Sequence, residues 1–426
     1  VGIVYIFNLI VGTGALTLPK AMASAGWLVS LILLCFLGFM SYITTTFMVE
    51  SLSIANACIR QTKKENLSED SMATTDTDSD PIEPPLQPSE HTSLINSTRN
   101  TATRVFSITR AVEMGQMADM FFNKIGRILF YLCIIIYLYG DLAIYAAAVP
   151  KSMRDIVCGN MSCAVNQNLT FPAFISMITL AIIHISSTGG GEGHPPVGSI
   201  GGIPNLFGVS VYSFMCQHSL PSLVTPIRNK KRLSVLLGAD YILILLFYML
   251  LGMTAIYCFK GGAIKDIYTL NFQDSCAVTN ILFLRYFLGL FPVFTLSSNF
   301  PIIAVTLRNN LKALFKPSNS FFVNRLFFPT LAIVPPIIVA FITNDLTTLV
   351  GVTGSYAGAG VQYVIPAFLV MIARREATRY HGIAVVNKNR HRSPFSRRLW
   401  VLVVIVWAIV CLIFVTVNHI MSLVAH

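Results

Sequence analysis

The sequence has 426 residues, of which 54% are hydrophobic and 12% are charged, against about 25% charged in an ordinary soluble domain. This composition excludes a soluble globular domain and indicates a protein that lies in a lipid bilayer. The formal net charge is +11, but the Lys and Arg residues gather in loops between apolar segments, as cytosolic anchors do. The charge therefore does not indicate a nucleic-acid partner.

Apolar segments dominate the chain. A segment of about 20 residues matches the roughly 30 Å hydrocarbon core at 1.5 Å per residue, and nine segments reach that length. A tenth apolar segment, at 172–185, is shorter, so whether it spans the membrane stays open at this point. The sequence thus predicts an all-α polytopic membrane protein. The nine predicted spans are 1–22, 27–49, 128–150, 203–226, 233–259, 279–305, 324–344, 345–373 and 399–421.

The first predicted span contains NLIVGTGALTLP, which carries two glycines, two threonines and a proline. Irregular backbone survives at membrane depth only where protein or a wet cavity covers it. Two explanations remain open: a broken helix at a binding site, or tight packing of small residues against a neighbouring helix.

Residues 59–111 are rich in Ser, Thr, Asp, Glu and Pro. Such a segment buries too little apolar surface to offset its ordering entropy, so we expect a disordered cytosolic loop. Within it EHTSLI places Glu90, Leu94 and Ile95 in the acidic dileucine pattern, which resembles signals bound by endolysosomal sorting adaptors. This pattern favours an endolysosomal over a plasma-membrane location.

The third span, 128–150, contains Asp141 in YLYGDLAIY. A carboxylate at membrane depth is costly and usually faces a cavity or a partner. Asp141 is therefore a candidate for cation or proton coupling, and the alternative is a structural hydrogen bond to a Tyr or to opened backbone.

The loop 151–170 follows the third span and should lie outside the cytosol. It holds two glycosylation acceptors, Asn160 in NMS and Asn168 in NLT. Cys158 and Cys163 in this loop and Cys276 in a later one allow a disulfide, whose pairing stays open.

Basic clusters at 228–232, 308–316 and 374–398 mark cytosolic ends. Because 151–170 should lie outside the cytosol and 228–232 inside it, an odd number of membrane crossings must separate them. Two candidate spans lie between them, at 172–185 and 203–226. PAFISMITLAIIHI has 14 residues, about 21 Å as a helix. Either it does not cross, or a span is missing beside it.

A second interrupted segment, GIPNLFGVSVYSFMCQHSLPSLVTP at 202–226, repeats the small polar residues and the LP step of the first. Paired broken spans at the starts of two halves are typical of inverted-repeat secondary transporters. Half-helix N-termini attract an anionic group and freed carbonyls attract a cation. We therefore expect Gly12, Thr13, Gly14, Tyr212 and Ser213 to frame an amino acid substrate.

Four further polar or charged residues lie near the second break or at the ends of spans. His218 could titrate between neutral and acidic pH, or be a hydrogen-bonded core histidine. Gln217 could contact substrate or satisfy backbone. Glu50 and Arg127 lie at span ends, where the side chains are expected to extend to the interface.

NLIVGTGALTLP, MADMFFNKIGR, FPVFTLSSNFPIIAVTLRNN and GVTGSYAGAGVQYVIPAFL resemble the amino acid/auxin permease family. The resemblance implies a five-plus-five inverted-repeat transporter fold with an extra C-terminal span, and amino acid transport. It also implies a sodium site at Asn8 with Ser297 and Ser298. This chain departs from the family by missing one span near residues 186 to 200.

The sequence predicts a secondary active amino acid transporter coupled to protons or sodium, working by alternating access. The alternative is a non-transporting sensor or scaffold at the endolysosomal membrane, or an inactive splice form. No enzyme or metal motif is present, and no cofactor is expected beyond a bound Na+ or H+. The expected segments are 1–58, the loop 59–111, 112–201, 202–373, the basic cytosolic loop 374–398, and 399–426.

Overall fold

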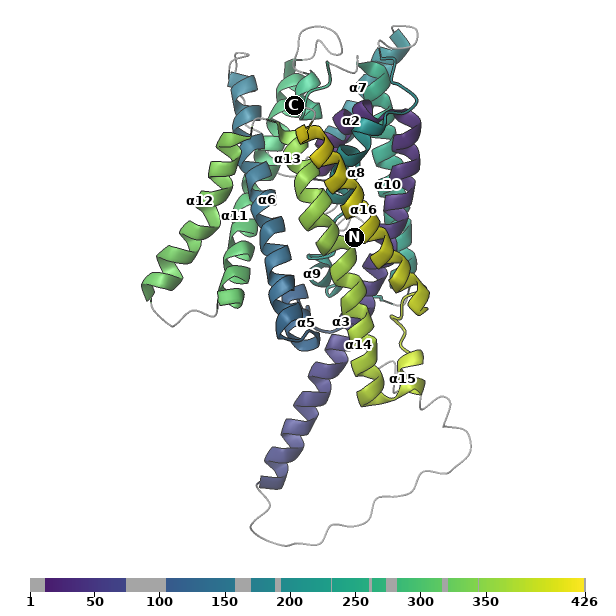
Figure 1. Cartoon of the computed structure of the whole chain (residues 1–426), viewed down its shortest axis with the longest axis vertical. Coiled ribbons are helices and arrows are strands. Elements are labelled where there is room, and N and C mark those ends of the chain that lie inside the picture. The colour runs from purple at the N-terminus through teal and green to yellow at the C-terminus, as the bar shows by residue number, and fades with distance from the viewer. Residues whose placement is uncertain are drawn as a thin grey trace.

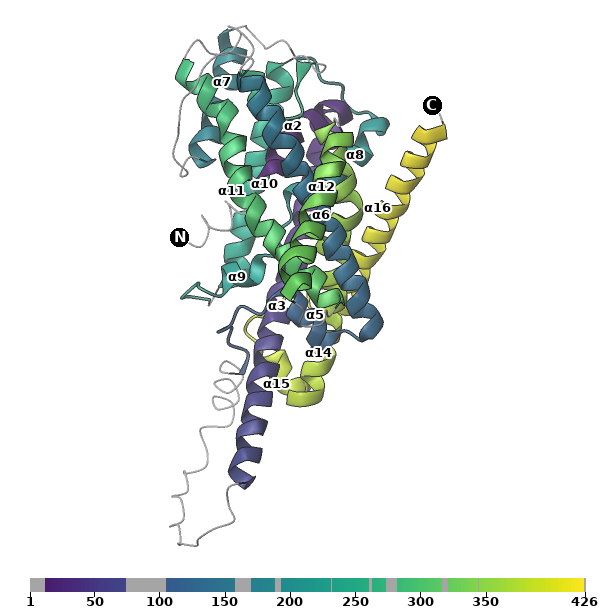
Figure 2. The ribbon, with the colours of Figure 1, turned by 90° about the vertical axis from the view of Figure 1, so that its left-hand side faces the viewer.

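The computed structural model describes residues 12–73, 105–157, 170–187, 193–230, 232–259, 263–272, 282–315, 321–343 and 345–424. All regular elements in these ranges are helices, as expected for backbone that must satisfy its hydrogen bonds inside lipid. Seven of them are long and apolar enough to cross a membrane, which agrees with the all-α polytopic prediction. Figures 1 and 2 show that they form an elongated bundle.

The long spans correspond to seven of the nine predicted segments. Two of them change helix type along their length: π turns at Val323–Phe327 lead into α12, and π turns at Gly354–Gly358 and Gly360–Val364 join α13 to α14. The seven spans are built from α3 (Trp27–Ala73), α6 (Lys124–Val157), α10 (Leu233–Cys258), α11 (Leu282–Phe315), α12 (Phe328–Ile342), α13 (Leu346–Thr353) with α14 (Ile365–His381), and α16 (Arg398–Val424).

The two remaining predicted spans are the interrupted ones. The first provides α2 (Thr13–Ala25), which begins directly after Gly12. The second provides α8 (Ile203–Ser213) and α9 (Leu220–Val224), with residues 214–219 between them outside any helix. The predicted break in the second segment is therefore present in the structure.

The two ends of the bundle differ in charge. The basic segment 374–398 lies at the lower end of Figure 1, with α15 (Ile383–Asn387); we call this the basic end. At the opposite end Asp266 forms ion pairs with Lys20 of α2 and Lys151 of α6, and accepts a hydrogen bond from Thr347 of α13. One carboxylate thus joins three helices.

Helix α7 (Thr170–Ser187) makes no net crossing. The end of α6 lies at the Asp266 end, because Lys151 pairs there. Beyond α7, Gly193 donates its N–H to Tyr257 near the end of α10 (3.0 Å), and Ser199 to Ala25 at the end of α2 (2.8 Å). The chain therefore returns to the same end, and α8 enters the bundle in the direction opposite to α2.

The predicted disordered loop 59–111 is wrong at both edges. Helix α3 continues to Ala73 and projects beyond the bundle (Figure 1). Near the other edge, Phe106 and Ile108 are buried, and Asn56 on α3 accepts hydrogen bonds from the N–H groups of Thr109 and Arg110. These two apolar side chains and the asparagine anchor a segment whose average composition is polar.

The basic loop 374–398 is more ordered than its charge suggested. Helix α14 extends to His381, and the residues after α15 pack on α3. Glu50 of α3 accepts two hydrogen bonds from Arg374 (2.7 and 2.9 Å) and one from the Ser393 N–H (2.9 Å). Glu50 is 1% exposed, so the expectation that it extends to the interface is wrong: its charge is paired inside the protein.

Candidate functional site at the helix breaks

The first turn of α2 lies against the last turn of α8. A Cβ atom at Gly14 would lie 2.6 Å from the Ser213 Cα atom. At the other end of the pair, a Cβ atom at Gly202 would lie 2.6 Å from the backbone nitrogen of Ala25. The two helices are therefore antiparallel and in direct backbone contact, with their interrupted ends side by side.

Of the two explanations for the GTG step, tight packing applies to Gly14, and a break at a binding site stays a prediction. Gly14 is a packing residue, since any side chain there would displace Ser213. Gly12 caps α2 with non-helical dihedral angles, and a Cβ atom at Gly12 would meet nothing within 4 Å. The first turn of α2 consequently starts at Gly12, and the positive dipole end of a helix N-terminus favours an anion.

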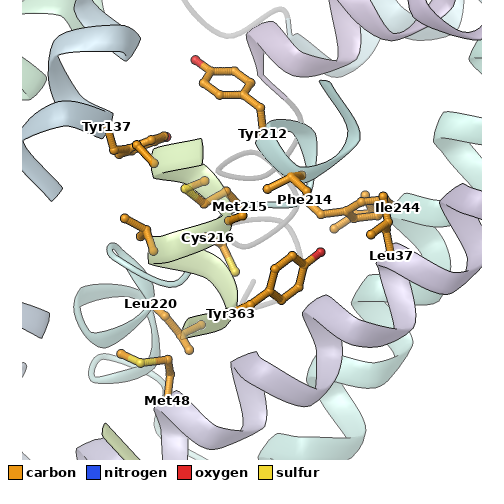
Figure 3. Close-up of a cluster of buried hydrophobic side chains, with 14 of the residues drawn as sticks. Leu37, Met48, Tyr137, Tyr212, Phe214, Met215, Cys216, Leu220, Ile244 and Tyr363 are labelled. Atoms are coloured by element: carbon orange, nitrogen blue, oxygen red, sulfur yellow. The ribbon is translucent and has the colours of Figure 1, made fainter. Parts of the chain in front are cut away.

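Hydrogen bonds to α3 and α10 stabilise the break between α8 and α9. Gln217 is fully buried, accepts from the Cys216 N–H (3.0 Å) and donates to Thr44 of α3 (3.1 Å). Tyr248 of α10 donates to the Ser213 carbonyl (2.9 Å). Of the two roles considered for Gln217, the structure shows the one that satisfies backbone. Figure 3 shows the residues around this break.

Asp141 lies beside the interrupted ends. It is 5% exposed, and the Tyr212 hydroxyl donates a hydrogen bond to its Oδ1. The ring of Tyr137, one turn earlier on α6, lies 6.4 Å from that of Tyr212. The structural hydrogen bond to a Tyr is thus present, and it places the carboxylate next to predicted substrate residues. A role in coupling stays a prediction.

Thr13 and His218 lie close to the same region. The Thr13 hydroxyl is buried without a hydrogen bond of normal geometry to a described residue, and Tyr145 of α6 is its neighbour. His218 is half-buried, its Nδ1 has no partner in the described part of the chain, and its ring lies 5.6 Å from that of Tyr137. His218 thus presents a ring nitrogen without a partner among the described residues, and Thr13 lies beside Tyr145.

Ser297 and Ser298 lie on α11 and both are exposed. Ser298 donates to the carbonyl of Thr295 within the same helix (3.0 Å). Their predicted partner Asn8 lies outside the described residues, so the sodium site stays a prediction. Also outside the described residues are Asn160, Asn168, Glu90, Leu94, Ile95, Cys158, Cys163 and Cys276.

Asp240 on α10 was missed by the sequence reasoning. It is fully buried, and neither carboxylate oxygen has a hydrogen-bond partner among the described residues. The signal was available, because Asp240 is the eighth residue of α10 and a carboxylate at that depth needs an explanation. Asp240 is a second candidate for a proton-binding residue.

A polytopic helical bundle in which α2 lies antiparallel to the interrupted segment of α8 and α9, beside a buried carboxylate, is typical of membrane transporters of the inverted-repeat type. The chain belongs to a family described as "Transmembrane amino acid transporter protein", whose sequence profile matches residues 2–382.

Individual relatives are similar over nearly their whole length. The chain is 50% identical to transmembrane protein 104 of Homo sapiens, over 99% of this chain and 96% of that protein. It is 38% identical to the homolog of Drosophila melanogaster (98% and 96%) and 34% identical to that of Dictyostelium discoideum (97% and 95%). Within this sequence, IYLYGDLAIYAAAVP and VYSFMCQHSLPSL most strongly resemble this group of relatives, and the comparisons confirm the resemblance.

Proposed function

We propose that this protein is a secondary active amino acid transporter coupled to a cation, with the substrate held where α2 meets α8. One observation carries the proposal: Gly14 at the start of α2 contacts Ser213 at the end of α8, directly beside the Asp141–Tyr212 hydrogen bond. A zwitterion needs an anion site and a cation site close together, and this junction offers both.

The N-terminal end of α2, with its positive dipole, suits the substrate carboxylate. Asp141 and the last carbonyls of α8 suit the ammonium group or a coupled cation. Because Thr13, Gly14, Tyr212 and Ser213 are all buried, substrate entry requires α2 and α8 to separate. Such a separation is the movement that alternating access needs.

The test is uptake of labelled amino acids into proteoliposomes under an imposed proton or sodium gradient. We expect Gly14→Val to abolish uptake, because the side chain displaces Ser213, and Asp141→Asn to uncouple uptake from the proton gradient. Gly201→Ala is the matched control, since a Cβ atom there meets nothing within 4 Å. Uptake that survives both Gly14→Val and Asp141→Asn would refute the site.

Sodium and proton coupling are separated by a second set of variants. If Asn8, Ser297 and Ser298 hold sodium, alanine at each raises the sodium concentration needed for half-maximal uptake and leaves the proton response unchanged. If Asp141 or Asp240 carries the proton, its Asn variant removes the proton response instead. Uptake that is insensitive to both gradients would indicate facilitated diffusion.

A second candidate function is a non-transporting amino acid sensor or an inactive form. One finding favours it: the alignment with the human relative runs over 481 positions against the 426 residues of this chain, a difference of 55. That is more than one span needs, and α7 makes no net crossing. A sensor shows saturable amino acid binding without flux, and deletion of the 74–104 segment abolishes partner capture while binding persists.

We also propose an endolysosomal location, with the basic end in the cytosol. Alanine at Glu90, Leu94 and Ile95 should move the protein to the plasma membrane if the dileucine pattern binds a sorting adaptor. Replacing Asn160 and Asn168 with Gln should remove glycan from the protein, as a shift on a gel. Unchanged location or mobility would exclude the corresponding signal.

A further inference from the structure

A groove of about 1020 Å³ lies on the outside of the bundle between α6 and α14, near the basic end. Helix α5 (Met114–Phe121), which precedes α6, closes its lower edge through Phe121. Figure 1 shows α5, α6 and α14 side by side at this end. The groove is separate from the junction of α2 and α8 and has no part in the proposed transport site.

The walls of the groove are apolar and lie within two membrane spans. Leu129 of α6 is 60% exposed and Phe368 of α14 is 39% exposed, and Ile372 lines the same surface. The lining runs from Asn123, the residue before α6, to Cys133 within it, about 15 Å at 1.5 Å per residue. That is half of the roughly 30 Å hydrocarbon core, the depth of one leaflet.

Positive charge is concentrated at the mouth of the groove. Arg375 and Arg379 both line it and both are exposed. They are four residues apart, so they lie on one face of α14. Neither guanidinium has an ion-pair partner in the described part of the chain. Asn123 and Thr378 add hydrogen-bonding groups beside them.

One acidic residue, Glu376, also lines the mouth. It is half-buried and lies near Cys58 of α3, toward the bundle. The outward charge at the mouth therefore remains positive. An apolar slot one leaflet deep with a paired guanidinium mouth is complementary to an anionic phospholipid: acyl chain along the walls, phosphate at the arginines.

We propose that the groove between α6 and α14 binds one anionic phospholipid of the cytosolic leaflet, with its headgroup on Arg375 and Arg379. A zwitterionic lipid fills the walls equally well but gains less from the mouth, because each arginine near an anionic headgroup contributes about 1 kcal/mol. Two arginines therefore predict roughly tenfold or stronger preference for the anionic lipid.

The test is native mass spectrometry of the full chain, purified from nanodiscs that contain an equimolar mixture of phosphatidylcholine and phosphatidylglycerol. The wild-type chain should retain one phosphatidylglycerol. The double variant Arg375→Gln with Arg379→Gln should retain roughly tenfold less phosphatidylglycerol than the wild type. The matched control, Arg397→Gln with Arg398→Gln, removes the same charge from two exposed arginines outside the groove and should retain the lipid.

A third variant tests the walls without changing charge. Leu129→Trp fills the slot and should weaken retention of phosphatidylglycerol, while thermal melting confirms that each variant folds. Retention of phosphatidylcholine to the same extent, or unchanged retention in the double variant, would overturn the proposal. So would displacement of the lipid by inorganic phosphate, which indicates a free-anion site, or a mass of two chains, which indicates a second copy in the groove.

Discussion

Gly14 lies where α2 packs directly on the backbone of α8. The Ser213 backbone occupies the position that a side chain at Gly14 would need, so the contact depends on the missing Cβ atom. Because backbone atoms cannot move aside as the end of a flexible side chain can, even a methyl group forces the two helices apart.

The first prediction concerns this contact. Gly14→Ala should lower the stability of the folded protein by about 1–3 kcal/mol, the usual cost of overpacking. Thermal melting in detergent measures the effect. Gly201→Ala, where a Cβ atom has open space, should melt with the wild type, and equal melting of Gly14→Ala would show that the helices can separate there at no cost.

The second prediction concerns His391, which lies in the segment after α15, outside the spans. Burial, together with the neighbouring Arg390 and Lys230, lowers the pKa of His391 to about 4, below the unfolded value of about 6.5. The unfolded chain therefore binds a proton first as pH falls, and stability is lost between about pH 6.5 and pH 4. His391→Gln should flatten the melting temperature over that window; an unchanged pH profile would contradict the assignment.

Single residues were predictable where they stand out from an apolar run. Asp141 and the glycines of the first interrupted segment did so, and the structure places Asp141 on Tyr212 and Gly14 on the neighbouring Ser213. Tyr241 and Tyr248 did not, because an aromatic residue in a span looks ordinary until its hydroxyl is seen on Thr45 or Ser213. Glu50 misled for a related reason: its partner Arg374 is 324 positions away in the sequence.

At the scale of elements, Asp266 connects the ends of three helices that the sequence places far apart. It lies between α10 and α11 and contacts Lys20 of α2, Lys151 of α6 and Thr347 of α13. The positions along the chain of the seven long helical spans followed from hydropathy alone. The contacts of Asp266 could not be predicted in this way, because no local sequence pattern shows which loop contacts which helix.

The third prediction follows from the charges around Asp266. Burial acts to raise the pKa of Asp266, but Lys151 and Lys20 outweigh it and hold the pKa below its ordinary value. The stabilisation is therefore complete at neutral pH and at pH 5, and is lost only as pH falls below about 4. Asp266→Asn should cost about 1–3 kcal/mol at pH 7 and remove that acid step.

The measurement is the melting temperature as a function of pH in the His391→Gln background, which removes the acid-sensitive histidine of the second prediction. Asp345→Asn serves as a control, because Asp345 comes no nearer to Lys20 than 3.9 Å and its side chain is about half exposed, so its ion pair is weaker. A loss of stability between pH 7 and pH 5 that disappears with Asp266→Asn would mean that the lysines do not protect the carboxylate.

At the scale of the whole molecule, the count of crossings determines the relation of the two halves. Because α7 makes no net crossing, α8 runs opposite to α2, as in an inverted repeat. The sequence left two alternatives, a run that does not cross or a missing span. The structure shows the first alternative, because the chain on both sides of α7 lies at the Asp266 end.

The fourth prediction tests this topology. Cysteines introduced singly at Ser199 and at Arg228 should react with an impermeant thiol reagent from opposite sides of the membrane. The cysteine at position 199 should react from the side on which the 151–170 loop is expected to be glycosylated. Reaction of both from one side would place α8 and α9 in the same half of the bilayer and remove the inverted relation.

Helix α3 has a mechanical consequence. It runs unbroken from Trp27 to Ala73, 47 residues, about 70 Å at 1.5 Å per residue and more than twice the hydrocarbon core. Its inner part packs on α10 and α14, while its far end projects past α15 (Figure 2). A rod held in the membrane behaves as a lever, so a small tilt between conformations becomes a larger displacement at Ala73, where the segment with the dileucine pattern begins.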